Sequence, residues 1–359
     1  MHQKTDILVI GGGVVGLSSA WKLAREGHNV TLMTAGKCGE GATLASLGVL
    51  MPYAPWMTSE NAKNETASLW SYPDFAQELL HETGIDIRYQ RTERLQWLTS
   101  EHQRQQYIDY LSFPNPNWGP SDIQIPQYYW TSSETARRMP EMAETPFGVV
   151  HCKATARVDV ASLVAALRSA CLKNGVDLRE DCPVTRLRYE NGKATFAQTA
   201  HGLMYANHYV LAAGAWSQKL LPETMQQTTW VKPIKGQAMM LQGSEPLIPY
   251  IIRAKGLYIV PMEHNRFMVG ATKEDVGFDD TLTHEAEDDL LTKAESLLPA
   301  LAEAKIIKKW CGFRPQAGKP GAQLGWCPEA ENVLMTFGHG GMGICMTPYI
   351  SREVIKFFQ

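Results

Sequence analysis

The hydrophobic pattern at the start of the chain predicts a strand, a helix and a second strand in close succession. Residues 4–10 (KTDILVI) are rich in β-branched and aliphatic side chains, as in a strand buried on both faces of a parallel sheet. Apolar positions then recur at helical spacing over 14–26, and Gly27 follows where a left-handed C-terminal cap is expected. A second strand over 29–33 completes a βαβ unit.

Farther along, buried strands and amphipathic helices follow one another. We expect helices over 159–172 and 285–298, a buried strand over 208–213 and a hairpin over 257–272. Residues 111–130 carry four prolines and five aromatic side chains, which excludes a regular helix across that segment.

Composition narrows the class of protein. The 359 residues are 44% hydrophobic and 20% charged, which indicates a globular enzyme of roughly two domains. Lysine and arginine number 34 against 37 aspartates and glutamates, so no basic surplus exists to bind nucleic acid. Seven scattered cysteines without a CxxC pair, and histidines without ligand spacing, argue for a reducing compartment and against a metal site. No apolar stretch is long enough to cross a membrane, so we expect a cytoplasmic protein.

A glycine-rich turn joins the first strand to the first helix. Residues 11–16 (GGGVVG) satisfy GxGxxG in the strand-to-helix context of a dinucleotide-binding turn. Gly11 permits the tight turn, Gly13 lets the backbone approach a pyrophosphate, and Gly16 lets the helix pack against the sheet. The helix N-terminus then faces the anion. The motif alone does not separate NAD from FAD, and a turn without any ligand is the plain alternative.

The end of the second strand departs from the dinucleotide-binding pattern. An Asp or Glu normally stands there and accepts hydrogen bonds from the adenosine ribose, whereas this chain has Thr34. A hydroxyl accepts a weaker, uncharged bond. Affinity for a dinucleotide must therefore depend on the rest of the site.

Nine short segments extend the pattern along the chain. They are IGGGVVG (10–16), GATLASLG (41–48), GIDIRYQRTERL (84–95), VLAAGAWS (210–217), VKPIKGQ (231–237), LYIVP (257–261), VGAT (269–272), WCGFRP (310–315) and GHGGMG (338–343). In this order they resemble the FAD-dependent D-amino acid oxidase family, particularly its glycine oxidase branch, which also includes sarcosine oxidases and D-amino acid dehydrogenases. Each segment alone is a weak signal; the set in family order is a strong one.

The resemblance implies an α/β fold with two domains. The first is a Rossmann-type FAD-binding domain made of residues 1–80, 146–225 and 310–359. The second is a mixed-sheet α+β substrate-binding domain made of residues 81–145 and 226–309.

The resemblance also implies FAD, held non-covalently. A covalent link at Cys311, as in the similar stretch of sarcosine oxidases, is the alternative, and core packing is the plainer interpretation of that cysteine. The implied cofactor-binding residues are Gly11, Gly13, Val14, Val15, Gly16, Thr34, Thr43, Ser46, Leu47, Gly48, Val184, Ala213, Gly214, Trp216, Arg314, Gly338, His339, Gly340, Gly341, Met342, Gly343 and Ile344.

GHGGMG suits the flavin end of the cofactor, because its glycines expose backbone N–H groups. If a helix begins there, its positive end favours the negative charge of reduced flavin. Pro348 leaves two alternatives: the helix kinks at the proline, or a new helix starts with Thr347 as N-cap and Pro348 at the first position.

Three residues are the implied catalytic set. Arg314 in GFRP offers a planar fork of donors that matches a substrate carboxylate, and Tyr258 in LYIVP adds a hydroxyl bond to the same group. Lys273, after VGAT, corresponds to a residue that lines the substrate cavity in glycine oxidases; a solvated lysine at a strand end is the plain alternative. Glycine oxidases have an arginine at the position of Gly341, so its absence indicates a roomier pocket and puts glycine in doubt as the substrate.

The implied activity is oxidation of a small amine, in the first place the Cα–N bond of an amino acid, by hydride transfer to flavin N5. The imine gives a keto acid and ammonia, and the electrons pass to oxygen or a quinone. Two alternatives stay open. One is a flavoenzyme of the same fold that acts on a protein-bound residue or a bulky amine, with 111–130 as docking surface or lid. The other is a non-catalytic nucleotide-binding module. Homo-oligomerisation also stays open.

Overall fold

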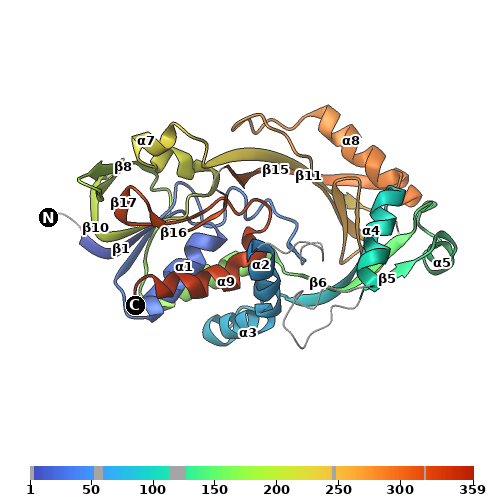
Figure 1. The fold of residues 1–359 in the computed structure, drawn as a ribbon, viewed down its shortest axis with the longest axis horizontal. Coiled ribbons are helices and arrows are strands. Elements are labelled where there is room, and N and C mark those ends of the chain that lie inside the picture. The colour runs from blue at the N-terminus through green and yellow to red at the C-terminus, as the bar shows by residue number, and fades with distance from the viewer. Residues whose placement is uncertain (1–3, 52–59, 113–126, 245–247, 319–320) are drawn as a thin grey trace.

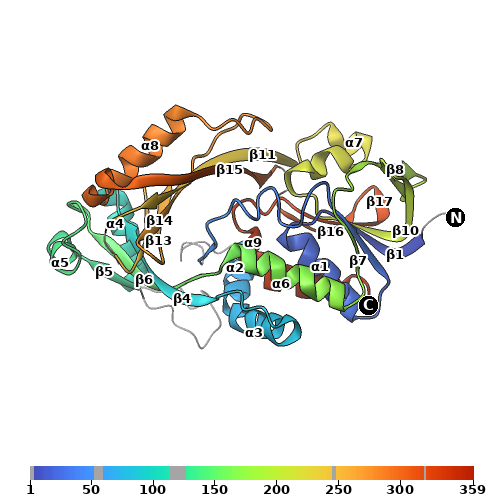
Figure 2. The same cartoon turned by 180° about the vertical axis from the view of Figure 1, so that it is seen from behind.

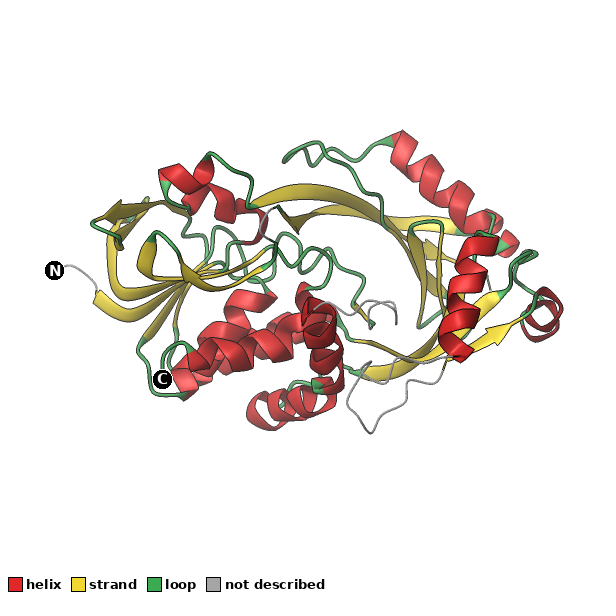
Figure 3. Ribbon diagram, viewed as in Figure 1, coloured by secondary structure: helices red, strands yellow, loops and turns green. Residues whose placement is uncertain are grey.

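The computed structural model describes residues 4–51, 60–112, 127–244, 248–318 and 321–359. Within these ranges the chain forms two sheets, one toward each end of an elongated molecule, with helices beside both (Figure 1, Figure 3). β1 and the C-terminus lie at the same end, as seen from either side (Figure 1, Figure 2). No helix of the described part is long and apolar enough to cross a membrane.

The first sheet is built around the N-terminal βαβ unit and has eight strands in the described residues. β1 pairs in parallel with both β10 and β2. The strand order is β16 (Gln323–Cys327), β17 (Ala330–Phe337), β10 (Gly202–Leu211), β1 (Lys4–Ile10), β2 (Val30–Met33) and β7 (Asp177–Arg179), with β8 (Val184–Glu190) and β9 (Lys193–Thr199) joined through β10.

The second sheet is mixed and has nine strands in the described residues. β12 and β4 pair in parallel, whereas β11, β14 and β15 pair antiparallel. The strand order is β15 (Lys305–Ala317), β11 (Val231–Gln242), β14 (Arg266–Gly270), β13 (Leu257–Met262), β12 (Ile251–Ala254), β4 (Gln90–Trp97), β6 (Val149–Arg157) and β3 (Val49–Leu50), with β5 (Gln127–Trp130) paired to β6.

Helices cover the faces of these sheets. In the described residues they are α1 (Val14–Arg25), α2 (Glu60–Trp70), α3 (Tyr72–Thr83), α4 (Glu101–Ser112), α5 (Ser132–Arg138), α6 (Val160–Lys173), α7 (Glu223–Gln226), α8 (His284–Glu295) and α9 (Gly343–Lys356), with 3₁₀ turns η1 (Gly214–Leu220) and η2 (Pro299–Glu303). α1 and α9 lie side by side in both views (Figure 1, Figure 2).

Burial on both faces explains the continuous apolar run of β1. Ile7 and Val9 belong to a core shared with α1, α6 and α9, whereas Leu8 and Ile10 belong to a core on the opposite face, with β8, β9 and η1. α8 covers the second sheet over a separate core. β11 connects two of these cores, because Val231 at its start lies in the core of the first sheet and Leu241 near its end lies in that of the second.

The elements expected from the pattern are confirmed, with small shifts of their ends except in β10. The helix expected over 159–172 is α6, and Asp159 caps it by accepting a hydrogen bond from the Ser162 N–H at 2.8 Å. The helix expected over 285–298 is α8, and the hairpin over 257–272 is β13 and β14. The strand expected over 208–213 is β10, which begins earlier, at Gly202.

The Pro and aromatic segment is described only at its two ends. The described part of α4 reaches Ser112, and Gln127–Trp130 form the strand β5, so the two described ends of the segment do not belong to one regular helix. The remainder of 111–130 lies outside the described residues.

α9 passes through Pro348 as one helix, so of the two alternatives left open the fresh start with Thr347 as N-cap is wrong. Proline cannot donate the hydrogen bond that the Ile344 carbonyl would accept in a regular helix. The Tyr72 hydroxyl donates to that carbonyl instead, at 3.2 Å. Ser68 repairs the next position, because its hydroxyl donates to the Cys345 carbonyl at 2.7 Å and accepts from the Tyr349 N–H at 3.1 Å. Side chains of α2 and α3 thus hold α9 in place.

The expected α/β class, with Rossmann-type parallel strands in one sheet and a second mixed sheet, is confirmed. The domain boundaries stay a prediction. The two sheets divide the chain somewhat differently from the predicted domains. β6 and residues 310–317 of β15 fall in the ranges assigned to the FAD-binding domain, but they pair within the second sheet.

Candidate active site

A cavity of about 1070 Å³ is lined by residues from both sheets. Its walls include the turn after β1, the loop before α9, and parts of β11, β13 and β15. Pockets for small ligands usually enclose roughly 300–1,000 Å³. The volume therefore suits an extended dinucleotide together with a substrate.

Most of the predicted cofactor residues line this cavity. They are Gly11, Gly13, Val14, Val15, Thr34, Thr43, Ser46, Leu47, Val184, Ala213, Gly214, Trp216, Arg314, His339, Gly340, Gly341, Met342, Gly343 and Ile344. Gly16, Gly48 and Gly338 are not among the lining residues.

Two glycines of the first turn allow close contact of the backbone with its surroundings. Gly11 has a φ of +117°, and a Cβ there would lie 2.3 Å from the Ala212 carbonyl oxygen. A Cβ on Gly16 would lie 1.9 Å from the Gly11 carbonyl oxygen, so α1 packs against β1 at a distance that excludes any side chain. The tasks assigned to these glycines agree with this geometry.

Two helix N-termini open into the cavity. α1 begins after Gly13 and α9 after Met342, and neither cap residue has a side-chain hydrogen bond to its helix. The Thr43 hydroxyl accepts from the Val14 N–H at 3.1 Å. A Cβ on Gly341 or Gly343 would meet nothing within 4 Å. Each end offers backbone N–H groups and a positive dipole end to an anionic or electron-rich ligand.

A carboxylate near the end of β2 escaped the sequence prediction. Thr34 packs against Gly12, where a Cβ would lie 2.7 Å from the Thr34 Cβ. Glu40, in the following loop, is the carboxylate among the lining residues of the described part, and its Oε2 accepts from the Lys37 N–H at 2.9 Å. The ribose-binding pattern expects a carboxylate at the end of the second strand, and Glu40 lies in the loop after it, so the pattern did not identify it.

Arg314 stands on β15, where the cavity meets the second sheet. Its guanidinium covers Gly236 of β11, where a Cβ would lie 2.6 Å from both Nη atoms. Nη1 donates to the Thr272 carbonyl oxygen at 2.8 Å. Burial lowers the pKa of Arg314 from its ordinary value, yet a guanidinium stays charged at neutral pH. Glu274 acts on Arg314 electrostatically, but its carboxylate is bound by Thr272, Gln237 and Lys235. The guanidinium of Arg314 thus lines the cavity as a positive charge.

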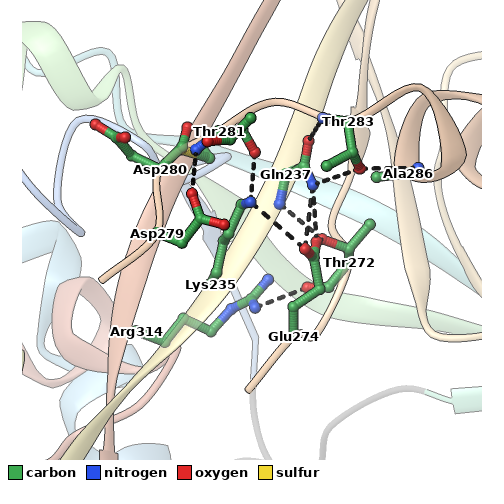
Figure 4. Close-up of polar contacts among 11 residues, drawn as sticks. Lys235, Gln237, Thr272, Glu274, Asp279, Asp280, Thr281, Thr283, Ala286 and Arg314 are labelled. Atoms are coloured by element: carbon green, nitrogen blue, oxygen red, sulfur yellow. Dashed lines mark hydrogen bonds and ion pairs between the residues drawn. The ribbon is translucent and has the colours of Figure 1, made fainter. Parts of the chain in front are cut away.

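A polar network behind Arg314 fixes the carbonyl that it contacts (Figure 4). The Thr272 hydroxyl donates to Glu274 and accepts from the Gln237 N–H at 2.8 Å. The Gln237 amide donates to both carboxylate oxygens of Glu274, at 3.0 and 3.2 Å. Lys235, which is 1% exposed, completes the network 3.6 Å from Glu274. The network holds segment 272–283 against β11 and thereby positions Thr272.

β15 is also tied to the cofactor end of the cavity. The Gly340 N–H donates to the carbonyl of Pro315 at 2.9 Å, and the Trp310 indole donates to the carbonyl of Ala45 at 3.0 Å. Arg314 therefore lies on β15 between Trp310 and Pro315, which contact two segments that the resemblance assigned to FAD binding.

Tyr258 lines the cavity beside Arg314, as the sequence predicts. Its hydroxyl donates to the sulfur of Met51 at 3.2 Å, and it contributes to the electrostatic environment of Arg314. Arg253, which the sequence analysis did not identify, lines the cavity on the other side of Tyr258. The signal available for Arg253 is the hairpin turn Lys255-Gly256, both with positive φ, which places Arg253 directly opposite Tyr258.

Lys273 and Cys311 are not brought to the cavity. Lys273 is exposed and does not belong to the lining, which corrects its placement in the catalytic set and agrees with a solvated strand-end lysine. The Cys311 thiol donates to the Asp280 carbonyl at 3.3 Å and is also outside the lining. A covalent flavin link at Cys311 has no support from this geometry.

His339 contributes an uncharged imidazole to the loop before α9. Burial lowers the pKa of His339 from its ordinary 6.5 to about 4. Its Nε2 lies 3.4 Å from the Thr336 hydroxyl. The ring is therefore neutral at physiological pH and adds no charge where the cofactor is expected.

The fold and the cavity define a flavin-dependent oxidoreductase. A model of the family described as FAD dependent oxidoreductase matches residues 6–356, and the chain belongs to this family. The glycine turn, the two helix N-termini whose own cap residues supply no side-chain bond, and the cavity volume fit FAD. The alternative of a non-catalytic nucleotide-binding module is thereby excluded.

Individual relatives point to a narrower group. Glycine oxidase of Pseudomonas putida strain KT2440 is 31% identical over 347 residues, which cover 96% of this chain and 91% of that protein. The bifunctional protein ThiO/ThiG of Synechocystis is 31% identical over 359 residues, covering 97% of this chain and 50% of that protein. The crystal structure of glycine oxidase from Geobacillus kaustophilus superposes with a TM-score of 0.88 at 28% identity, covering 99% of this chain and 95% of that one.

Proposed function

We propose that this flavoenzyme oxidises the Cα–N bond of an amino acid or a similar amine that bears a carboxylate. The observation that carries the proposal is Arg314, a charged guanidinium that lines the cavity and whose hydrogen-bond partner in the described ranges is a backbone carbonyl. A guanidinium binds a carboxylate through two parallel N–H bonds. The similarity to glycine oxidases supports the same chemistry.

Arg314 and Tyr258 are the residues that would hold the substrate. Arg314 neutralises the carboxylate, and the Tyr258 hydroxyl exchanges its weak sulfur acceptor, Met51, for a carboxylate oxygen. Both side chains stand on strands of a rigid sheet, so the carboxylate has a fixed place and the remainder of the substrate is turned toward the cofactor end. Thr272 and its network keep Arg314 in this position.

FAD, held along the glycine turn and the loop before α9, supplies a two-electron acceptor when bound. Oxidation removes a hydride from Cα while the nitrogen lone pair forms the C=N bond of an iminium ion, which releases a proton to give the imine. The amine nitrogen must therefore be uncharged when the hydride leaves. The positive charge of Arg314 disfavours a protonated amine nearby. Water hydrolyses the imine to a keto acid and ammonia.

Position 341 supports a substrate larger than glycine. Gly341 lines the cavity, and a Cβ there would meet nothing within 4 Å. The arginine that glycine oxidases carry at this position is therefore replaced by open space. The same space keeps a bulky amine or a protein-bound residue as the second candidate substrate.

The proposal is tested by anaerobic mixing of the purified holoenzyme with D- and L-amino acids, glycine, sarcosine and larger amines. Bleaching of the visible flavin band reports oxidation. Each amino acid is paired with its amide, which lacks the carboxylate charge. We expect bleaching by at least one acid and slower bleaching by its amide; equal rates for acid and amide contradict the role of Arg314. Bleaching by the larger amines alone would favour a bulky amine, and absence of bleaching by every free amine would favour a protein-bound residue.

The electron acceptor and the cellular location belong to the same proposal. We infer a cytoplasmic enzyme whose reduced flavin returns its electrons to oxygen or to a quinone. Formation of hydrogen peroxide in air identifies an oxidase, whereas reoxidation that requires a quinone identifies a dehydrogenase. Light scattering of the purified protein decides whether it forms a homo-oligomer.

A further inference from the structure

A second arginine occupies the substrate end of the cavity. Arg253 of β12 lies directly across from Tyr258 of β13, so their side chains share one face of the sheet. The Arg253 guanidinium carbon lies 5.7 Å from the centre of the Tyr258 ring. Tyr258 and Arg314 line the same cavity. The tyrosine therefore lies beside Arg253 and shares the cavity with Arg314.

Arg253 is held in position by a neutral partner. Gln96, which pairs with it on the neighbouring strand β4, accepts from Nη1 of Arg253 at 3.2 Å and donates to the Arg253 carbonyl, also at 3.2 Å. In the described ranges the hydrogen-bond partner of the Arg253 guanidinium is thus a neutral amide and not a carboxylate. A guanidinium has five N–H donors, so this contact leaves donors for a ligand.

The cavity lining has more positive charges than a substrate with one carboxylate would neutralise. The charged side chains of the described lining are Glu40, Lys219, Arg253 and Arg314. Glu40 contacts the loop after β2, and Lys219 of η1 lies over the ring of Phe278, 5.1 Å from its centre. The second sheet thus contributes two cations and no anion to the lining.

A third arginine strengthens the positive potential of this wall. Arg94 stands on the same face of β4 as Gln96, is 4% exposed, and donates to the sulfur of Met51 at 3.0 Å. Met51 is also the acceptor of the Tyr258 hydroxyl. One substrate carboxylate on Arg314 would leave Arg253 uncompensated in a partly buried site, which is costly.

We propose that the substrate carries two acidic groups: the carboxylate beside the reacting carbon binds Arg314, and a second carboxylate binds Arg253. The substrate class is an acidic amino acid or another amine dicarboxylate. This inference rests on the proposed function and names the substrate class of that site. The second carboxylate would supply the charged partner that the Arg253 guanidinium lacks in the described ranges, where its contact is the neutral amide of Gln96.

The experiment compares kcat/KM of the holoenzyme for matched acids and amides: D- and L-aspartate against asparagine, and D- and L-glutamate against glutamine. We expect at least one acid to be preferred over its amide by roughly ten- to a hundredfold, as for one charged hydrogen-bonded pair. In Arg253→Met this preference should disappear, and in Arg253→Lys it should be partly retained. Arg266→Met, on the same sheet but outside the cavity lining, is the matched control and should keep it.

Equal kcat/KM for acid and amide in the wild type, or an unchanged preference in Arg253→Met, would overturn the inference. Binding of malonate and acetate, followed by the change in the flavin spectrum, separates this result from a failure of the proposed function. If no amine reduces the flavin, tighter binding of malonate that depends on Arg253 still supports the diacid site. Equal binding of malonate by wild type and Arg253→Met then rejects it.

Discussion

The two ends of the cavity are built by different means. At the end proposed for the cofactor the lining offers mainly backbone groups, at the turn after Gly11 and at the N-termini of α1 and α9. At the substrate end they come from side chains, above all Arg314, Tyr258 and Arg253, on three different strands. A binding site made of backbone groups keeps its ligand when its side chains are exchanged. A binding site made of side chains changes its ligand specificity with a single substitution. The difference explains how a family can keep its cofactor while its substrates diverge.

Substitution of Arg314 gives the largest expected effect on activity, and it should affect the substrate end of the cavity but not the cofactor end. Arg314→Met removes a charged bond to the substrate carboxylate, which is worth about 3 kcal/mol and lowers kcat/KM by roughly a hundredfold. Flavin content should stay at the wild-type level, because the backbone of the cofactor end is intact. Steady-state kinetics on a confirmed substrate and the absorption spectrum test both statements. An unchanged kcat/KM contradicts the assignment of Arg314.

Ser68 tests the backbone end. Ser68→Ala leaves the Cys345 carbonyl and the Tyr349 N–H of α9 without their buried partner, which costs about 2 kcal/mol. The free energy of unfolding, measured with urea, should fall by this amount, and affinity for FAD should fall with it. Ser19→Ala is the control, because this buried serine makes one local bond, to Val15. Equal losses in both variants would show that Ser68 does not brace the helix.

Gly236 tests whether the substrate end depends on the exact place of a side chain. In Gly236→Ala the new Cβ would lie 2.6 Å from the Arg314 Nη atoms, so the guanidinium must move. We expect roughly a tenfold rise in KM, about 1.4 kcal/mol, with little change in kcat. Gly325→Ala is the control, since a Cβ there meets nothing within 4 Å. A KM equal to that of the control variant would mean that Arg314 binds from another position.

His339 gives the smallest expected effect, and it belongs to the cofactor end. Folding favours its neutral form, because its pKa falls from 6.5 to about 4. The stabilisation is complete above pH 6.5 and is lost as the pH falls from there toward 4. Between roughly pH 7 and 5.5 the loss is about 1 kcal/mol. Urea unfolding of apoprotein should show this extra pH dependence in the wild type and not in His339→Gln; parallel pH profiles would contradict it.

The difference between the two ends of the cavity also explains which of their residues could be predicted from the sequence. Residues 11–16 and the loop before α9 were found because consecutive glycines carry the signal. Glu40 and Arg253 were not, because one lies in an irregular loop and the other gains its meaning from pairing with Tyr258 and Gln96. Lys273 was placed by a correspondence in order along the chain, which does not determine on which side of a strand end a side chain lies.

Long-range contacts also decide the structure around Pro348. The local pattern allowed two helices or one, since proline favours a first helical position and breaks an interior one. The choice depends on Ser68 and Tyr72, which approach from a distant part of the chain and satisfy the groups that proline leaves open. The early start of β10 has a similar cause, because residues 202–204 pair with β9 at a partly solvated edge and lack a continuous apolar run.

β11 runs from the core of one sheet into the core of the other, so a single strand belongs to both halves of the enzyme. Unfolding of either half would remove one of the two hydrophobic cores against which β11 packs. Heating or limited proteolysis should therefore dismantle the protein in one cooperative event, and occupancy of the nucleotide groove should protect the distant substrate half as well.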